Sequence, residues 1–153
     1  MNKKYIIGID PDVDRSGVAI YSKIANEFIE VQSCTFFEFF NFISNSAIEY
    51  YFVIIEAGWL NEKSNWHGQH GAASERIAKN VGANHEVGRK IVEMCEYLGF
   101  DYKVQKPLKK CWSGSGGKIT QNELEKLTGF KKRTNQDQRD ACLIAWHNKD
   151  VKF

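Results

Sequence analysis

The sequence of 153 residues predicts a mixed α/β fold with five strands. Two observations support this prediction. The first three strand candidates are separated only by short turns, which favours an antiparallel start to the sheet. Each later strand candidate follows a helical segment, which favours parallel crossovers. We find no repeat, low-complexity tract or linker in the chain, and we expect a single domain over residues 1–153.

Apolar runs bounded by turn-forming residues predict the strands. The run YIIGID reaches a Pro directly after Asp10, as a buried strand that ends in a turn does. The run EFIEVQS alternates apolar and polar residues, which is typical of a half-exposed antiparallel strand. YFVIIEA is the clearest strand, because its apolar and β-branched residues continue up to Glu56. The five predicted strands cover residues 5–10, 17–22, 27–33, 51–57 and 101–105.

Apolar residues at helical spacing predict helices at residues 36–51, 74–98, 119–130 and 136–148. Gly99 suits the C-terminal cap of the second helix, which is the longest, and the glycines within residues 82–90 would allow close packing at a dimer interface. The polar, glycine-rich residues 58–71 are predicted to form a loop, and loops of this length are usually functional or disordered. The apolar stripe of the long helix consists of Ile77, Val81, Val87, Ile91, Met94, Cys95 and Leu98.

The composition is that of an ordinary water-soluble protein, with 42% hydrophobic and 26% charged residues. The apolar run near the N-terminus is too short for a signal peptide, and no segment approaches the length of a membrane span. The four cysteines are scattered, without a CxxC pair or a nearby histidine, and we expect reduced thiols. We therefore expect a cytoplasmic protein that has no membrane partner.

The positive charge is concentrated in one segment of the chain. Residues 1–102 carry 9 basic and 14 acidic side chains, whereas residues 103–133 carry 9 and 2, and the last twenty residues carry 3 and 3. A segment of this kind suits a polyanion such as a nucleic acid. On charge alone, a solvated lysine-rich surface explains it equally well.

Three aspartates, Asp10, Asp12 and Asp14, follow the first strand within five positions. They match the first ligands of a calcium-binding EF-hand loop, but that loop needs Gly at its sixth position and Glu at its twelfth. Arg15 and Tyr21 occupy those positions here. A phosphate-binding turn of the actin-like ATPase type needs a second half-domain, for which the chain is too short, so we expect no nucleotide cofactor.

Four carboxylates on three elements could meet at one edge of the sheet. Asp10 and Glu56 end two strands, and Asp137 and Asp140 lie three positions apart, on one face of the last helix. Such a cluster is costly without a cation, and Mg²⁺ or Mn²⁺ is the usual partner of oxygen ligands. Each aspartate also has a local explanation, as a turn former or as a residue favoured at a helix N-terminus. Glu56 at the end of an apolar strand is harder to explain in that way.

Four segments together resemble the RuvC family of Holliday junction resolvases, which are nucleases with an RNase H-like fold. The segments IIGIDPDVDRSGVAI, VIIEAGW, PLKKCWSGSGGKITQNEL and NQDQRDACLIA span nearly the whole chain in the family's order. The resemblance implies a mixed five-stranded sheet with an antiparallel N-terminal meander and helices on both faces. It also implies a homodimer that resolves four-way DNA junctions by symmetric cleavage, in recombination and repair. The metal-binding catalytic acids that it implies are Asp10, Glu56, Asp137 and Asp140.

The resemblance and the two-metal mechanism of phosphodiester cleavage suggest individual roles. Asp10 would bridge two Mg²⁺ ions, for which Mn²⁺ could substitute, and Glu56 and Asp140 would complete their coordination. Asp137 would hold the ion that activates the attacking water, and Lys118 would stabilise the phosphate in the transition state. Two alternatives stay open: a less selective nuclease for flaps, forks or RNA/DNA hybrids, and a catalytically inactive module that binds branched DNA.

The basic segment matches the family as well. A Pro, a Lys pair, a Gly-x-Gly turn and a further Lys occur in order between Pro107 and Lys118, and the family's lysines hold DNA phosphates near the scissile bond. Tryptophans in the loop after Glu56 could stack on an unpaired base or pack the loop onto the body. The expected DNA-binding residues are Lys106, Lys109, Lys110, Lys118, Lys131, Lys132, Arg133, Trp59 and Trp66.

The chain departs from the family in two places. The family usually has a small residue after the Asp-Pro pair, whereas this chain has Asp12, followed by Asp14, either as extra metal ligands or as solvated turn residues. The loop over residues 58–74 is also longer and richer in Trp and His than expected. Its His67 and His70 could bind a metal, although a polar loop explains them at least as well.

Overall fold

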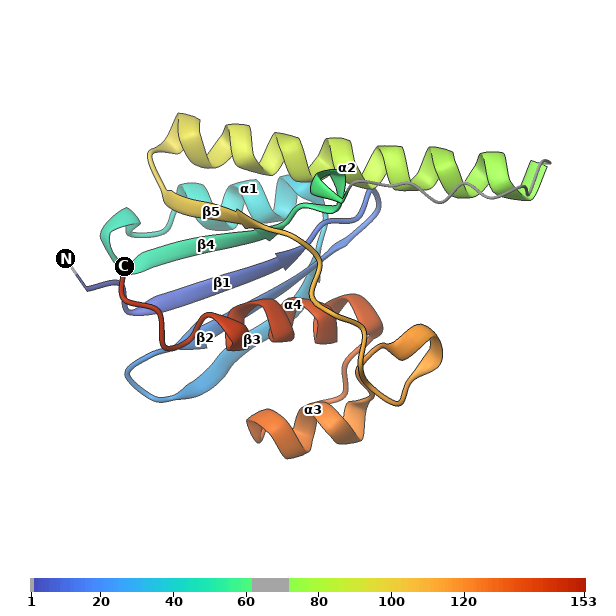
Figure 1. Cartoon of the computed structure of the whole chain (residues 1–153). Helices are drawn as coiled ribbons and strands as arrows, with labels where there is room; N and C mark the ends of the chain where they lie inside the picture. The colour runs from blue at the N-terminus through green and yellow to red at the C-terminus, as the bar shows by residue number, and fades with distance from the viewer. Residues whose placement is uncertain (1, 62–71) are drawn as a thin grey trace.

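The computed structural model describes residues 2–61 and 72–153. Five strands form its central sheet: β1 Tyr5–Asp10, β2 Ser16–Ser22, β3 Glu27–Cys34, β4 Tyr51–Glu56 and β5 Asp101–Gln105. Their order in the sheet (Figure 1) is β3-β2-β1-β4-β5. β2 pairs antiparallel with both β1 and β3, whereas β4 pairs parallel with both β1 and β5. The predicted mixed sheet with an antiparallel N-terminal meander is therefore confirmed.

Among the described residues, four α-helices accompany the sheet: α1 Phe36–Ser44, α2 Ala72–Leu98, α3 Gln121–Thr128 and α4 Gln136–His147. The described connections contain three 3-10 turns: η1 Ile48–Tyr50, η2 Gly58–Leu60 and η3 Ser115–Gly117. α1 and α2 lie on one face of the sheet, and α4 lies on the other with α3 beside it (Figure 1). This arrangement confirms the expectation of helices on both faces.

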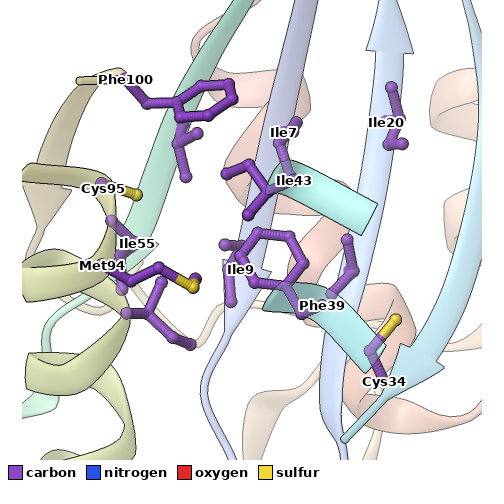
Figure 2. Close-up of a cluster of buried hydrophobic side chains, with 13 residues drawn as sticks. Ile7, Ile9, Ile20, Cys34, Phe39, Ile43, Ile55, Met94, Cys95 and Phe100 are labelled. Atoms are coloured by element: carbon purple, nitrogen blue, oxygen red, sulfur yellow. The ribbon is translucent and has the colours of Figure 1, made fainter. Parts of the chain in front are cut away.

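The two faces of the sheet bury separate apolar clusters, because successive side chains of a strand point to opposite faces. One cluster joins the strands to α1 and α2 (Figure 2), and the other joins them to α3 and α4. β1 and β4 are buried on both faces, which explains their continuous apolar sequences. Fully buried strand residues are Ile7, Ile9, Val53 and Ile55 in the first cluster and Ile6, Ala19 and Ile54 in the second.

The helix predicted over residues 36–51 is wrong beyond the end of α1. Polar side chains take the last helix carbonyls: Asn45 Nδ2 donates to the Asn41 carbonyl at 2.7 Å. Ser46 Oγ donates in the same way to the Phe42 carbonyl at 2.8 Å. Such local bonds compete with the backbone ladder and favour the end of a helix over its continuation. A single 3-10 turn, η1, then leads into β4.

The apolar stripe predicted for the long helix packs on the sheet only in its C-terminal half. Ile91, Met94 and Cys95 belong to the core, whereas Ile77 is 59% exposed and Val81 is 42% exposed. The N-terminal half of α2 extends past the end of the sheet (Figure 1). Ile77 and Val81 therefore lie beyond the reach of the core that holds the rest of the stripe.

No helix among the described residues is long and apolar enough to cross a membrane. The four cysteines are free thiols, of which Cys34, Cys95 and Cys142 are buried and Cys111 is exposed. Burial raises the pKa of Cys95 and Cys142 to about 12, and thiols in such surroundings are chemically inert.

Candidate active site

The cleft at the carboxyl ends of β1 and β4 contains the four carboxylates that the sequence singles out. β1 and β4 are parallel and in register, so Asp10 and Glu56 lie at the same edge of the sheet. α4 begins at this edge and contributes Asp137 and Asp140 from its first two turns. All four carboxylates line one cleft with a volume of about 890 Å³. The structure thus brings together three elements that are far apart in the sequence.

A capping box fixes the start of α4 at this edge. Asn135 Oδ1 accepts from the Gln138 backbone N–H at 2.9 Å, and Gln138 Oε1 accepts from the Asn135 backbone N–H at 3.0 Å. The side-chain amides of both residues also donate to Ser33 Oγ at 3.0 Å, near the end of β3. The first turn of α4, which carries Asp137, is therefore tied to the sheet.

Two glycines allow α4 to lie directly on the sheet. A Cβ atom at Gly17 of β2 would lie 2.0 Å from the carbonyl oxygen of Asp137. A Cβ atom at Gly8 of β1 would lie 2.3 Å from the carbonyl oxygen of Ala141. No side-chain rotation can relieve such clashes, because the atoms belong to the helix backbone. Glycine at both positions therefore sets how deeply α4 and its carboxylates enter the cleft.

The carboxylates in the cleft act on one another electrostatically. Burial, followed by repulsion from Glu56, Asp140 and Asp137, raises the pKa of Asp10 to about 9, although Lys118 opposes the shift. Burial and the charge of Asp140 also raise the pKa of Glu56. Groups with strongly shifted pKa values in a cleft are typical of functional sites. The cluster of four acids in this cleft carries an excess of negative charge.

Lys118 supplies positive charge beside these acids. Its Nζ lies 3.4 Å from Asp140 Oδ2, and Gln136 Nε2 donates to Asp140 Oδ1 at 2.9 Å. The carbonyl of Ile119 accepts from Gln136 Nε2 at 3.3 Å and from Arg139 Nε at 3.0 Å. The segment that carries Lys118 is therefore fastened to α4, which carries two of the acids.

The donor set suits a hard divalent cation, because it consists of carboxylate oxygens whose mutual repulsion a cation would relieve. The side chains do not form a closed cage: no group of three or more His, Cys, Asp or Glu side chains in the described ranges is arranged to hold a metal ion. Asp140 is engaged by Lys118 and Gln136 instead. The residues therefore suit a divalent cation by their chemistry and their location.

Asp12 forms a turn that borders the acids. Its Oδ1 accepts from the Asp14 backbone N–H at 2.8 Å, which is the geometry of an Asx turn. The backbone N–H of Val13 donates to Asn84 Oδ1 at 2.8 Å and ties this turn to α2. Asp14 is exposed, whereas Asp12 lines the cleft, and burial together with Asp12 raises the pKa of Asp137. These contacts support a turn-forming role for Asp12.

The basic residues among the expected DNA-binding residues divide into two groups. Three lysines line the cleft beside the acids, namely Lys109, Lys110 and Lys118. The other four basic residues that were expected to bind DNA are exposed and lie outside the cleft lining as the structure describes it: Lys106, Lys131, Lys132 and Arg133. Trp66, His67 and His70 fall outside the described residues.

Trp59 forms the part of the cleft wall that adjoins α2. Its ring packs so closely on α2 that a Cβ atom at Gly88 would lie 2.4 Å from Cζ3, and its edge-to-face contact with His85 has a centroid distance of 6.2 Å. A Cβ atom at Gly58 would likewise lie 2.7 Å from His85 Nε2. Gly88 therefore serves packing within the chain, whereas Gly82, expected with it at a dimer interface, faces open space.

Three polar residues of α2 in the cleft wall were missed in the sequence: Asn84, His85 and Arg89. Together with Val81 they occupy positions i, i+3, i+4 and i+8, and such positions share one helix face. This spacing was the available signal, but the apolar stripe of the same helix was the stronger one. Only the docking of α2 against η2 shows that the polar face points into the cleft.

Comparison with solved structures places the fold. Thermus thermophilus RuvC in complex with a Holliday junction substrate aligns with a TM-score of 0.55 and 12% sequence identity, over 92% of this chain and 89% of that chain. A second T. thermophilus RuvC structure, whose description names no substrate, aligns with a TM-score of 0.49 and 15% identity, over 92% of this chain and 90% of that chain. A fowlpox virus resolvase in complex with substrate Holliday junction DNA gives 0.46 and 14%, over 95% and 97%. No protein-family model and no curated protein matches the chain.

The mixed five-stranded sheet with helices on both faces is an RNase H-like fold. Within this class the fold is similar to that of T. thermophilus RuvC, because the alignment with a TM-score of 0.55 covers nearly the whole of both chains. The fold implied by the four sequence segments is therefore confirmed.

Proposed function

We propose that the protein is a metal-dependent endonuclease that resolves four-way DNA junctions. The observation that carries the proposal is the convergence of Asp10, Glu56, Asp137 and Asp140 on one cleft at the edge of the sheet, where burial and the charges of the other three acids raise the pKa of Asp10 to about 9. Lysines beside this cluster suit a phosphodiester backbone. The resemblance to a RuvC described in complex with a Holliday junction substrate supports branched DNA as the substrate class.

The residues of the cleft have complementary tasks in such a reaction. The four carboxylates would hold divalent cations, Mg²⁺ or Mn²⁺, which supply activation of a water molecule and stabilisation of the leaving oxygen. Gln136 orients the Asp140 carboxylate through its hydrogen bond to Oδ1. Lys118, next to the same carboxylate, would stabilise negative charge on the phosphate as it builds up. Lys109 and Lys110 would bind flanking phosphates.

The test is cleavage of a synthetic four-way junction in Mg²⁺, compared with duplex, fork and RNA/DNA hybrid substrates of matched length. We expect paired nicks at symmetric positions of the junction and at least about tenfold slower cleavage of the other substrates. Equal cleavage of all four substrates would show that the protein is a less selective nuclease and not a junction resolvase. Tight junction binding without cleavage in Mg²⁺ or Mn²⁺ would leave only a DNA-binding module.

Symmetric cleavage of a junction requires two active sites, and we propose that the protein acts as a homodimer. The exposed N-terminal half of α2 (Figure 1) offers a surface for this contact, because it carries Ile77 at 59% exposure. In a twofold interface each substitution acts twice, so a charge at this position has a large effect. Sedimentation of the wild-type chain is expected to show a dimer, and Ile77→Asp is expected to shift it to the monomer.

Ala78→Asp is the matched control, because it introduces the same charge at the next, exposed position of the helix. It points about 100° away from Ile77 on the helix circumference. An Ile77→Asp variant that sediments as the wild-type dimer would exclude this face as the interface.

A further inference from the structure

Cationic side chains flank the acids of the cleft from two different elements. Lys118 pairs with Asp140 of α4, and Lys109 and Lys110 precede it in the same segment. Arg89 lines the same cleft from α2, which covers the opposite face of the sheet (Figure 1). The cleft therefore has a lysine wall on the α4 side and a second wall on the α2 side, with the carboxylates between them.

Arg89 is held in place by an aromatic platform. Its guanidinium lies 5.3 Å from the centroid of the Trp59 ring, within the range of a cation–π contact. The ring is itself immobilised, since it packs on Gly88 so closely that a Cβ atom there would overlap it. Its edge-to-face contact with His85 restricts the movement of the ring in a second direction. An arginine stacked in this way loses little conformational freedom when it binds a ligand.

Arg89 also has hydrogen-bonding capacity to offer. Its ion pair with Glu86, at 3.6 Å, joins side chains that are 51% and 60% exposed, and a surface pair of this kind contributes little free energy. Burial and the charge of Arg89 lower the pKa of His85, which keeps the imidazole neutral near pH 7. Among the α2 residues that line the cleft, Arg89 therefore carries the permanent positive charge.

We propose that Arg89 binds a backbone phosphate of the DNA strand in the cleft, on the side opposite the lysines. Arginine suits this task because its planar fork of N–H donors matches phosphate oxygens. Trp59 is then a positioning residue for Arg89, and its packed ring does not stack on an unpaired base. The inference rests on the proposed function, since it requires a DNA strand in the acidic cleft, and it adds a phosphate subsite on α2.

The test measures binding of a four-way junction, without divalent cations, over a series of NaCl concentrations. Arg89→Ala is expected to weaken binding about tenfold and to reduce the slope of log K against log salt by about 1, as loss of one phosphate contact does. The matched control is Lys90→Ala, which removes the same charge at the next position. Lys90 Nζ pairs with Glu93 at 2.9 Å and lies outside the cleft lining described above. We expect the control to match the wild type in both quantities.

Two further variants separate the charge of Arg89 from its placement. Arg89→Lys retains the charge and should restore the salt slope but only part of the affinity. Trp59→Leu should weaken binding in the wild-type background and add nothing in the Arg89→Ala background, because a positioning residue acts through its partner. Additive losses in that double-mutant cycle would overturn the positioning role of Trp59.

The outcomes distinguish this inference from the proposed function. If the wild-type chain binds and cuts the junction while Arg89→Ala equals Lys90→Ala in affinity and salt slope, the α2 phosphate subsite is excluded and the nuclease stands. If the wild-type chain binds no junction at any salt concentration, the proposed function and the subsite both fail. Arg89 is exposed, so thermal melting of Arg89→Ala is expected to match the wild type.

Discussion

Asp10→Asn is expected to abolish Mg²⁺-dependent cleavage of a four-way junction while junction binding in Ca²⁺ is retained. Asp10 ends β1, and its pKa responds to the charges of the other three carboxylates, so it is the acid most closely coupled to the rest of the cluster. Metal ions contribute several kcal/mol to phosphodiester cleavage. Loss of Asp10, the proposed metal ligand, should therefore slow the reaction by at least about 10³-fold.

Asp14→Asn is the control for this prediction. This substitution makes the same change from a carboxyl to an amide four positions later, but the side chain of Asp14 is exposed and does not line the cleft as the structure describes it. Single-turnover rates on a labelled junction are the measurement, and Asp14→Asn should stay within about threefold of the wild type. An Asp10→Asn enzyme that cuts at the rate of the Asp14→Asn enzyme would remove Asp10 from the catalytic site.

Asp10 also determines how stability depends on pH in the absence of divalent cations. Its pKa is raised from 3.8 to about 9 in the folded protein, so between these values the folded chain binds a proton that the unfolded chain has released. The stability that this group contributes is fully present below about pH 4 and is lost as the pH rises toward 9. Asn cannot ionise, so Asp10→Asn should melt a few degrees higher than the wild type near pH 8.

The same comparison near pH 4 provides the internal control, because both side chains are then neutral in the folded state. The melting temperatures should converge there. A constant difference at both pH values would contradict a carboxyl group that burial and neighbouring acids keep protonated.

Gly17→Ala is expected to lower the free energy of unfolding by about 2 to 3 kcal/mol and to reduce cleavage sharply. The added methyl group would lie 2.0 Å from the carbonyl oxygen of Asp137, so α4 has to move away from β2. Displacement of α4 also moves Asp137 and Asp140 away from Asp10, and a misplacement of about 1 Å in a catalytic site costs roughly 10²-fold in rate.

Gly82→Ala is the matched control for the glycine substitution. A Cβ atom at Gly82 meets no atom within 4 Å, and the residue lies inside α2. Alanine is the better helix former, so this variant should gain about 0.5 to 1 kcal/mol in urea denaturation. A Gly17→Ala protein with wild-type stability and activity would show that α4 does not rest on β2 as described.

The strands follow from local properties of the sequence. The apolar runs at residues 5–10 and 51–56 are buried on both faces of the sheet, and their ends place Asp10 and Glu56 at one edge, as predicted. The i, i+3 spacing of Asp137 and Asp140 likewise places both on one side of α4, which lines the cleft. The strand ends and the i, i+3 spacing depend on burial and on helix or strand periodicity. Both can be recognised from the order of residues alone.

The errors have a different origin. Side-chain hydrogen bonds of Asn45 and Ser46 end α1 early, although the apolar pattern continues beyond it. Periodicity reports which face of a helix is apolar, and it does not report which polar group will take a carbonyl. In the same way, the stripe of α2 continues to Ile77, but the sheet beneath it does not.

The sequence by itself determined the order of strands and helices, the four acids and the basic segment. The tertiary structure decided how these meet: Gly8 and Gly17 set the depth of α4, and the docking of α2 on Trp59 brought Arg89 into the cleft. Contacts of this kind join residues from different elements, and their distances depend on close packing across the sheet. Local pattern therefore specifies the elements and the residue types of the site, whereas packing specifies its walls.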